Sequence, residues 1–344
     1  MLNRALLLAA ALCIGSLLTQ MHIPIPFLLG GVLAAIAVKS FTNSSVNWPK
    51  PWRDCGLLAA GYGIGANFTA TAWDDMLQQL LGVVEATGSI LLISILLAFV
   101  SAKLAGEDLK SCVIGMLPGG MTMSMLLAEE DKKINPNVVI VMQVLRLFGV
   151  VVSVPFLVIY LLDAKIIGSS IAMPNHGGYH WLIFIPLAVC GGYLAQKIHM
   201  PTPILLGAIL ATAVFSVLVG TVQPIPFWLM APAQASIGIF MGMQLDAGRV
   251  AKARHVLPCV IMGTVVLIGI SILMANVLSL RYGFSLITAF LAMAPGGIAE
   301  MSLAGMSMGE DVSIILTYQL VRVFAINLFV PPLLKWWFKE KEDL

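Results

Sequence analysis

Ten long apolar stretches follow one another along this chain with short polar gaps, and they restrict its fold more than any other feature. Most are close to the roughly 17–25 apolar residues that a helix needs to cross a hydrocarbon core. Charged residues make up only 10% of the 344 residues, whereas soluble domains carry about 25%. We therefore expect an all-α integral membrane protein of about ten transmembrane helices. The expected helices cover residues 4–20, 27–41, 54–71, 78–103, 137–161, 181–197, 203–220, 232–248, 256–280 and 312–334.

The chain contains one unit twice. Residues 13–34 (CIGSLLTQMHIPIPFLLGGVLA) align without a gap with residues 190–211 (CGGYLAQKIHMPTPILLGAILA), at an offset of 177 positions. Each half then carries a Pro-Gly-Gly tripeptide and, about 25 positions later, a Q-x-x-R motif. We predict two membrane repeats, residues 1–165 and 178–340, with five helices each.

The Pro-Gly-Gly tripeptide interrupts an apolar stretch between the fourth and fifth predicted helices of each half. Lys and Arg concentrate on the cytoplasmic side of membrane proteins, so their distribution distinguishes a crossing from a re-entrant hairpin. Two re-entrant hairpins place 15 Lys and Arg on one side and 2 on the other, whereas two crossings place 11 and 6. We therefore predict a re-entrant hairpin in each repeat and both termini in the cytoplasm.

Five crossings are an odd number, so the second repeat is expected to enter the membrane from the opposite side to the first. Inverted repeats with interrupted helices are typical of secondary transporters that work by alternating access. The first apolar stretch resembles a signal peptide, but its pattern returns at residues 185–194, so we expect it to be retained. The expected location is the inner (plasma) membrane.

The hairpin tips are the predicted ligand site. Glycine pairs let a ligand approach the backbone closely, and the helix that follows each tip directs its N–H groups toward an anion. Arg146 and Arg322 each lie about ten residues, or roughly 15 Å, from the nearer end of their segment. A guanidinium can hold a carboxylate through two hydrogen bonds. The predicted substrate-binding residues are Pro118, Gly119, Gly120, Thr122, Ser124, Gln143, Arg146, Pro295, Gly296, Gly297, Ser302, Gln319 and Arg322.

These residues also have structural interpretations. Pro-Gly-Gly can serve as a kink for helix packing, and the two arginines can pair with Glu300, Glu85 or hairpin carbonyls. Glu300 is either a coupling-ion or proton site or a counter-ion for an arginine. Asn67 and Gln244 are either coupling-ion groups or helix–helix contacts. The predicted coupling-ion residues are Glu300, Glu85, Asn67 and Gln244, with Na⁺ or H⁺ as the ion.

The paired Pro-Gly-Gly and Q-x-x-R motifs, with an H-x-P-x-P turn at residues 22–26 and 199–203, resemble the AbrB membrane-protein duplication family. Members of that family often carry an ammonia monooxygenase label, which the residues here do not support, since the chain lacks a copper-type histidine cluster. The arrangement is more distantly similar to sodium–glutamate symporters and 2-hydroxycarboxylate transporters. That similarity implies a small organic anion as substrate, usually with sodium, and a dimeric scaffold.

We therefore expect a secondary transporter of a small solute, an organic anion such as an amino acid or carboxylate, bound between the two tips. An exporter or channel for another solute, or a membrane regulatory or sensor protein, is the alternative. We expect no enzyme activity, no cofactor, no metal site and no nucleic-acid partner. The expected partners are the substrate and the lipid bilayer, and a homodimer stays open.

Overall fold

The computed structural model describes residues 2–41, 47–68, 78–118, 134–162, 181–219 and 225–339, and all the regular structure in these ranges is helical. The chain forms two compact units. The first contains residues 1–77, 152–245 and 298–315, and the second contains residues 78–151, 246–297 and 316–344. Each unit thus combines segments from both halves of the sequence, so the compact units and the two predicted repeats divide the chain differently.

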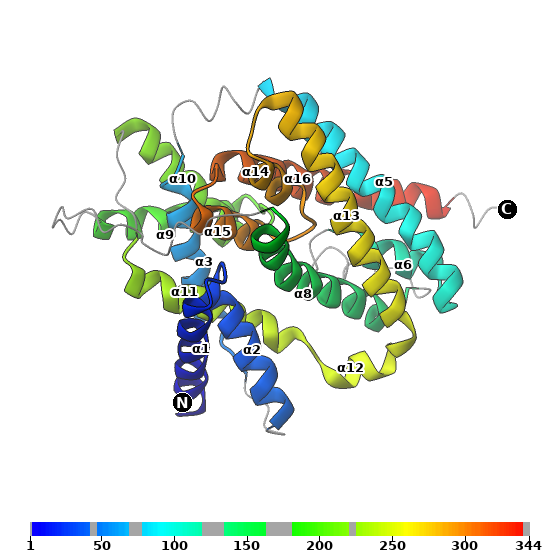
Figure 1. Cartoon of the computed structure of the whole chain (residues 1–344), viewed down its shortest axis with the longest axis horizontal. Helices are drawn as coiled ribbons and strands as arrows, with labels where there is room; N and C mark the ends of the chain where they lie inside the picture. The colour runs from blue at the N-terminus through cyan, green and yellow to red at the C-terminus, as the bar shows by residue number, and fades with distance from the viewer. Residues whose placement is uncertain are drawn as a thin grey trace. The chain divides into compact units, whose positions relative to one another are not determined.

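The helices of the first unit come mainly from the beginning of each half (Figure 1). They are α1 (Leu2–Gln20), α2 (Pro26–Phe41), α3 (Lys50–Gly65), α9 (Trp181–Lys197), α10 (Pro203–Val219), α11 (Phe227–Gln244) and α15 (Ile298–Met308). The helices of the second unit are α5 (Leu80–Ala105), α6 (Leu109–Met116), α12 (Ala247–Lys252), η1 (Arg254–Val256), α13 (Leu257–Tyr282) and α14 (Leu286–Met293). Two long helices, α8 (Pro136–Leu161) and α16 (Val312–Lys339), each continue from one unit into the other.

All ten predicted stretches contain a helix, but their crossing of a membrane is supported to different degrees. Five described helices are long and apolar enough to span a bilayer, and they lie at residues 3–20, 80–105, 136–161, 254–282 and 312–333. The helices α3 and α11 begin before their predicted starts because a proline, Pro49 or Pro226, occupies each N-cap position. Proline is tolerated there because its missing N–H would have no partner inside the helix.

Glycines let helices of the first unit approach closely. The helix α2 packs on α11, and α3 packs on α10. A Cβ atom built on Gly238 of α11 would lie 2.0 Å from the Leu28 carbonyl oxygen of α2, and one on Gly65 of α3 would lie 2.5 Å from the Ile209 carbonyl oxygen of α10. Small residues at such contacts are how helices associate where lipid surrounds them.

Both H-x-P-x-P turns adopt the same strained backbone. His22 and Ile25 have φ of 54° and 48°, and their counterparts His199 and Thr202 have φ of 55° and 44°. In each turn the residue after the histidine donates its N–H to a carbonyl five residues earlier, at 3.1 Å. This is the hydrogen bond of a Schellman helix end, which normally has glycine at the left-handed position.

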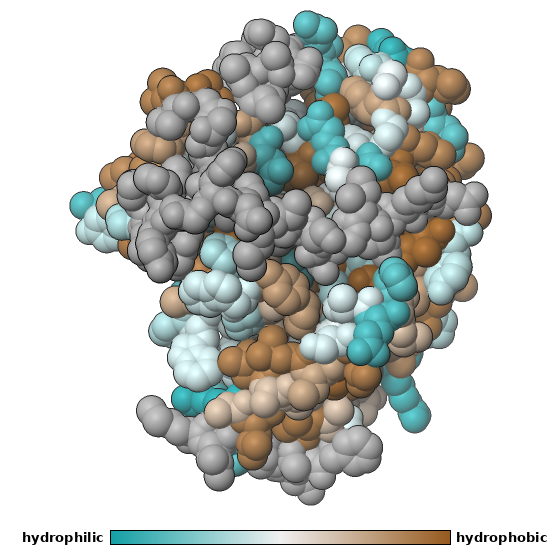
Figure 2. All heavy atoms as spheres, turned by 60° about the vertical axis from the view of Figure 1, so that its left-hand side comes forward, coloured by the Kyte–Doolittle hydropathy of each residue, from teal (hydrophilic) through white to brown (hydrophobic). Residues whose placement is uncertain are grey.

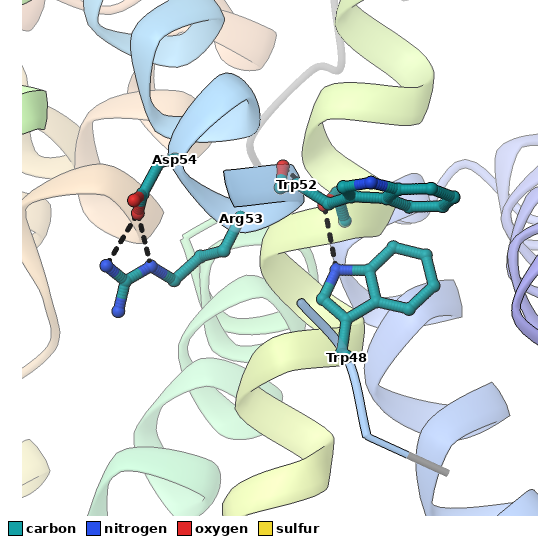
Figure 3. A network of polar contacts seen from close by, with 5 residues as sticks. Trp48, Trp52, Arg53 and Asp54 are labelled. Atoms are coloured by element: carbon teal, nitrogen blue, oxygen red, sulfur yellow. Dashed lines mark hydrogen bonds and ion pairs between the residues drawn. The ribbon is translucent and has the colours of Figure 1, made fainter. Parts of the chain in front are cut away.

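A polar network fixes the start of α3 against α11 within the first unit (Figure 3). The buried Trp48 donates its indole N–H to the Ser236 hydroxyl at 3.0 Å, and that hydroxyl donates to the Trp52 carbonyl at 2.8 Å. Arg53 pairs with Asp54 at 2.6 Å and stacks over Phe240. The network has no counterpart in the second half, where Ile225, Leu229, Met230 and Ala231 occupy the equivalent positions of Trp48 and 52–54.

Large apolar side chains lie exposed on several helices, including Leu6 and Leu17 of α1 and Leu273 and Leu280 of α13, at 60% exposure or more. Figure 2 shows patches of such apolar surface next to polar ones. Extended apolar surface of this kind is costly in water, whereas lipid tails cover it without penalty. The exposed surface therefore agrees with a multi-pass membrane protein.

Candidate functional site

The second Pro-Gly-Gly separates two short helices, α14 and α15. They contain 8 and 11 residues, too few for either to cross a bilayer alone. Ala294 has φ −52° and ψ 133°, the extended conformation that a residue before proline prefers. The Gly296 N–H donates to the Ala294 carbonyl at 2.8 Å, which makes a tight turn around Pro295. Gly296 and Gly297 are partly exposed, although the residues on both sides of them are buried.

Gln319 of α16 contacts the backbone that precedes the break. Its side-chain Nε2 donates to the carbonyl oxygens of Leu291 at 2.9 Å, Ala292 at 3.4 Å and Ala294 at 3.1 Å. The last carbonyls of an α-helix have no partner inside the helix. The amide of Gln319 therefore satisfies acceptors at the end of α14 that would otherwise be buried without a donor.

Arg322 lies one helical turn further along α16 and contacts the same segment. Its Nη1 donates to the Met293 and Ala294 carbonyls at 3.2 and 2.9 Å, and its Nη2 donates to the Gly296 carbonyl at 3.0 Å. Nη2 also donates to the Gln319 side-chain oxygen. The four N–H groups of the two terminal nitrogens thus match four acceptors, and only the Nε–H has no partner among the described residues.

The first half repeats these contacts where it is described. Gln143 of α8 donates to the Ile114 carbonyl at 3.0 Å, and Arg146 donates to the Met116 carbonyl at 2.8 Å. These acceptors lie 177 positions before Leu291 and Met293, the acceptors of the second half. Of the predicted first-half site, Gly119, Gly120, Thr122 and Ser124 lie outside the described residues, whereas Pro118 is described and buried.

The two arginines of the Q-x-x-R motifs are buried. Arg322 is 2% exposed and Arg146 is 6% exposed. No ion pair joins either of them to a carboxylate in the described part of the chain. Among the partners expected from the sequence, the described ones are main-chain carbonyls at the helix ends before the two breaks and at Gly296.

Sequence reasoning missed Ser271 of α13, which donates to the Met293 carbonyl at 3.3 Å as well as to the Leu267 carbonyl of its own helix. Ser271 and Ser94 are matched at the offset of 177, which is a signal that could have singled them out. The Ser94 hydroxyl is buried and has no partner among the described residues.

Glu300 and Ser302, the predicted residues on α15, belong to the first compact unit, whereas the two arginines belong to the second. Glu300 lies in the first turn of α15 and is 8% exposed. The N-terminal turn is where a helix stabilises a negative charge. The Ser302 hydroxyl is fully buried and finds no partner among the described residues.

The remaining predicted residues make other contacts or end a helix. Glu85 of α5 pairs with Arg281 of α13 at 2.7 Å, and both side chains are about half exposed. Asn67 donates to the Gly63 carbonyl of its own chain segment at 2.7 Å, and Gln244 is the last residue of α11. The described residues contain no group of three His, Cys, Asp or Glu that could hold a metal ion.

These features can be compared with known proteins. The family described as "Transition state regulatory protein AbrB" matches residues 27–338, and the chain belongs to this family. The chain is 28% identical over 301 residues to "Uncharacterized protein YhjN" of Bacillus subtilis strain 168, covering 82% of this chain and 77% of that protein. It is 25% identical over 332 residues to "Putative regulator AbrB" of Escherichia coli strain K12, covering 94% and 95%.

Proposed function

We propose that this protein is a secondary transporter of a small organic anion, such as an amino acid or a carboxylate, and works by alternating access. The observation that carries the proposal is the pair of buried guanidinium groups, Arg146 and Arg322, beside the ends of two short helices. Buried charges with no carboxylate partner among the described residues are costly, and an anionic ligand offsets that cost.

The proposal includes two inverted repeats. The matched helices α5 and α13 support it because they pack against each other in opposite directions (Figure 1). Glu85 near the start of α5 pairs with Arg281 near the end of α13, and Glu107 just after the end of α5 pairs with His255 just before the start of α13, at 2.7 and 2.8 Å. Matched helices that run antiparallel are what an inverted duplication produces.

The packing of the first unit gives further support. The helices α2 and α10 are matched by the offset, and so are α3 and α11. The contact of α2 with α11 is therefore the counterpart of the contact of α10 with α3. Two equivalent contacts, each between one helix of each half, support an approximate two-fold axis between the proposed repeats. Such an axis lets two equivalent half-sites face opposite sides of the membrane in turn.

The proposed ligand contacts are Arg146 and the backbone at Gly296 and Gly297. A guanidinium hydrogen-bonded to neutral carbonyls keeps its positive charge, so Arg322 makes the break favourable for an anion even without touching it. Glu300 is the proposed coupling group, since a buried carboxylate is suited to bind a proton or a sodium ion together with the anion. The relative named as a regulator suggests a regulatory protein instead, but no described feature favours that function over transport.

Ligand-dependent thermal stabilisation and uptake test the proposal. Purified protein is screened against amino acids, di- and tricarboxylates, Na⁺ and choline, and stabilising anions are then offered in labelled form to proteoliposomes. We expect at least one anion to raise the melting temperature and to be taken up against an imposed Na⁺ or proton gradient. Arg146→Ala is expected to lower uptake about 100-fold or more, because removing a charged hydrogen-bond donor costs about 3 kcal/mol or more.

Arg249→Ala serves as the matched control, because Arg249 is about half exposed on α12 and pairs only loosely with Asp246, at 3.7 Å. Glu300→Gln is expected to retain anion binding and to lose the dependence of uptake on the gradient. An anion panel that neither stabilises the protein nor enters the vesicles would overturn transport, and normal uptake by Arg146→Ala would remove the direct role of that arginine.

A further inference from the structure

We infer that Gln319 and Arg322 form a backbone clamp, which holds the end of α14 and the Pro-Gly-Gly break in one conformation, and that Arg322 is a positioning residue. This inference deepens the proposed function, because it concerns the same site. It differs from the expectation that Arg322 grips the transported anion. Gln143 is assigned the corresponding role at the end of α6, where it holds the Ile114 carbonyl.

Most N–H groups of the Gln319 and Arg322 side chains donate to backbone carbonyls around the break. The clamp donates to the carbonyls of residues 291, 292, 293, 294 and 296, so between residues 291 and 296 it leaves out only the Pro295 carbonyl. Ser271 adds a second bond at Met293. Buried carbonyls without a donor are costly at membrane depth, so this set of contacts is what allows a non-helical segment there.

The shape of the guanidinium is suited to this role. Its planar fork places N–H groups in fixed directions, and Arg322 uses both terminal nitrogens on backbone carbonyls and on the Gln319 side-chain oxygen. A bidentate grip on a carboxylate needs two neighbouring N–H groups, whereas Arg322 has only its Nε–H without a partner among the described residues. The positive charge of Arg322 at the C-terminal end of α14 also interacts favourably with the partial negative charge of the helix end.

The clamp limits which ligand can approach the α14 side of the break. A sodium ion there would need carbonyl oxygens that already accept hydrogen bonds from Arg322 and Gln319, and it would lie beside a guanidinium. The break therefore favours an anionic or neutral part of a ligand. A coupling cation therefore belongs at another place, and the proposed group for it is the buried Glu300 in the first turn of α15.

Hydrogen–deuterium exchange on the purified full-length protein tests the clamp without any knowledge of the substrate. Gln319→Glu has the same shape and keeps an oxygen for Arg322, but it cannot donate to the three carbonyls. We expect it to speed amide exchange at residues 290–297 about tenfold or more, since each lost buried hydrogen bond lowers the free energy of local opening. Arg322→Lys is expected to give an intermediate change, because an ammonium has three donors and no planar fork.

Gln196→Glu is the matched control, because Gln196 is exposed near the end of α9 in the other unit. It should leave exchange at residues 290–297 unchanged. Arg322→Ala is compared only if it is recovered folded, and Gln143→Glu should produce the same local effect around residues 113–118. Unchanged exchange at 290–297 in folded Gln319→Glu and Arg322→Lys protein would overturn the clamp.

The exchange result and the uptake result are independent. Local loosening in Gln319→Glu without any transported anion leaves the clamp in place and removes the transporter proposal. Where transport is measured, the clamp predicts that Arg322→Lys lowers the maximal uptake rate while the KM for the anion changes less than about threefold, since the ligand contact itself is kept. A rise in KM of about 100-fold or more at an unchanged maximal rate would instead show that Arg322 binds the anion directly.

Discussion

Single residues in this protein show how a duplicated sequence can place different chemistry in equivalent positions. Ile25 and Thr202 are counterparts, both precede a proline and both have positive φ. Ile25 is fully buried, whereas Thr202 is exposed. Left-handed backbone costs a residue with a Cβ atom roughly 1–2 kcal/mol, and the cost is greater for β-branched side chains. The two positions therefore have the same backbone strain, but only Ile25 offsets it by burying an apolar side chain.

Substituting each of these two residues with glycine should have opposite effects on stability. Thr202→Gly removes strain and loses no buried surface, so the free energy of unfolding should rise by about 0.5–1 kcal/mol after the larger freedom of glycine in the unfolded chain is counted. Ile25→Gly removes the same strain but also a buried side chain, so it should lower stability by about 2–4 kcal/mol. Thermal unfolding in detergent measures both variants, and a fall in melting temperature for Thr202→Gly would contradict this account.

The positions of the helices could be predicted from the sequence better than the contacts between them. Long apolar runs located the helices, because a run near twenty residues has few other ways to satisfy its backbone in lipid. The clamp could be anticipated only in part. The Q-x-x-R motif named the two donors, but their acceptors are main-chain carbonyls, which look the same at every position of a sequence. Ser271 was missed for the same reason, since its partner is the Met293 carbonyl.

Helix contacts through glycine provide a test at the scale of elements. Gly238→Ala would place a methyl group 2.0 Å from the Leu28 carbonyl oxygen, so α11 and α2 must separate, and stability should fall by about 2 kcal/mol or more. Gly269 of α13 is the matched control, because a Cβ atom there meets nothing within 4 Å. Gly269→Ala should raise stability by about 0.5–1 kcal/mol, since alanine is the better helix former. Equal effects of the two variants on the melting temperature would contradict the close approach of α11 and α2 at Gly238.

At the scale of the whole molecule, the sequence match at an offset of 177 predicts two repeats, but it could not predict how the helices are grouped into compact units. Each compact unit takes equivalent helices from both halves, so that the first unit contains α1, α2 and α3 together with α9, α10 and α11. Such grouping depends on contacts between segments more than 150 positions apart, as between Lys39 and the Met243 carbonyl. Local hydrophobic periodicity carries no information on such pairs. The offset of 177 shows which helices are equivalent, and packing decides which of them meet.

The proposed inverted arrangement makes a prediction that concerns the whole chain. Lys103 near the end of α5 and Arg281 near the end of α13 occupy almost equivalent positions, since 103 and 280 are matched by the offset. Inverted repeats place these two ends on opposite sides of the membrane, whereas parallel repeats place them on the same side. The excess of Lys and Arg on one side predicts Lys103 in the cytoplasm and Arg281 outside.

Single cysteines at the two positions measure this directly. The five native cysteines are first replaced, because three of them (Cys13, Cys55 and Cys190) are exposed and would react. In intact cells, a membrane-impermeant maleimide should label Arg281→Cys and should label Lys103→Cys only after the cells are opened. Labelling of both positions from the same side would exclude inverted repeats, and with them the alternating exposure of two equivalent half-sites. Labelling in the reversed pattern would keep the inversion and place both termini outside, against the charge bias.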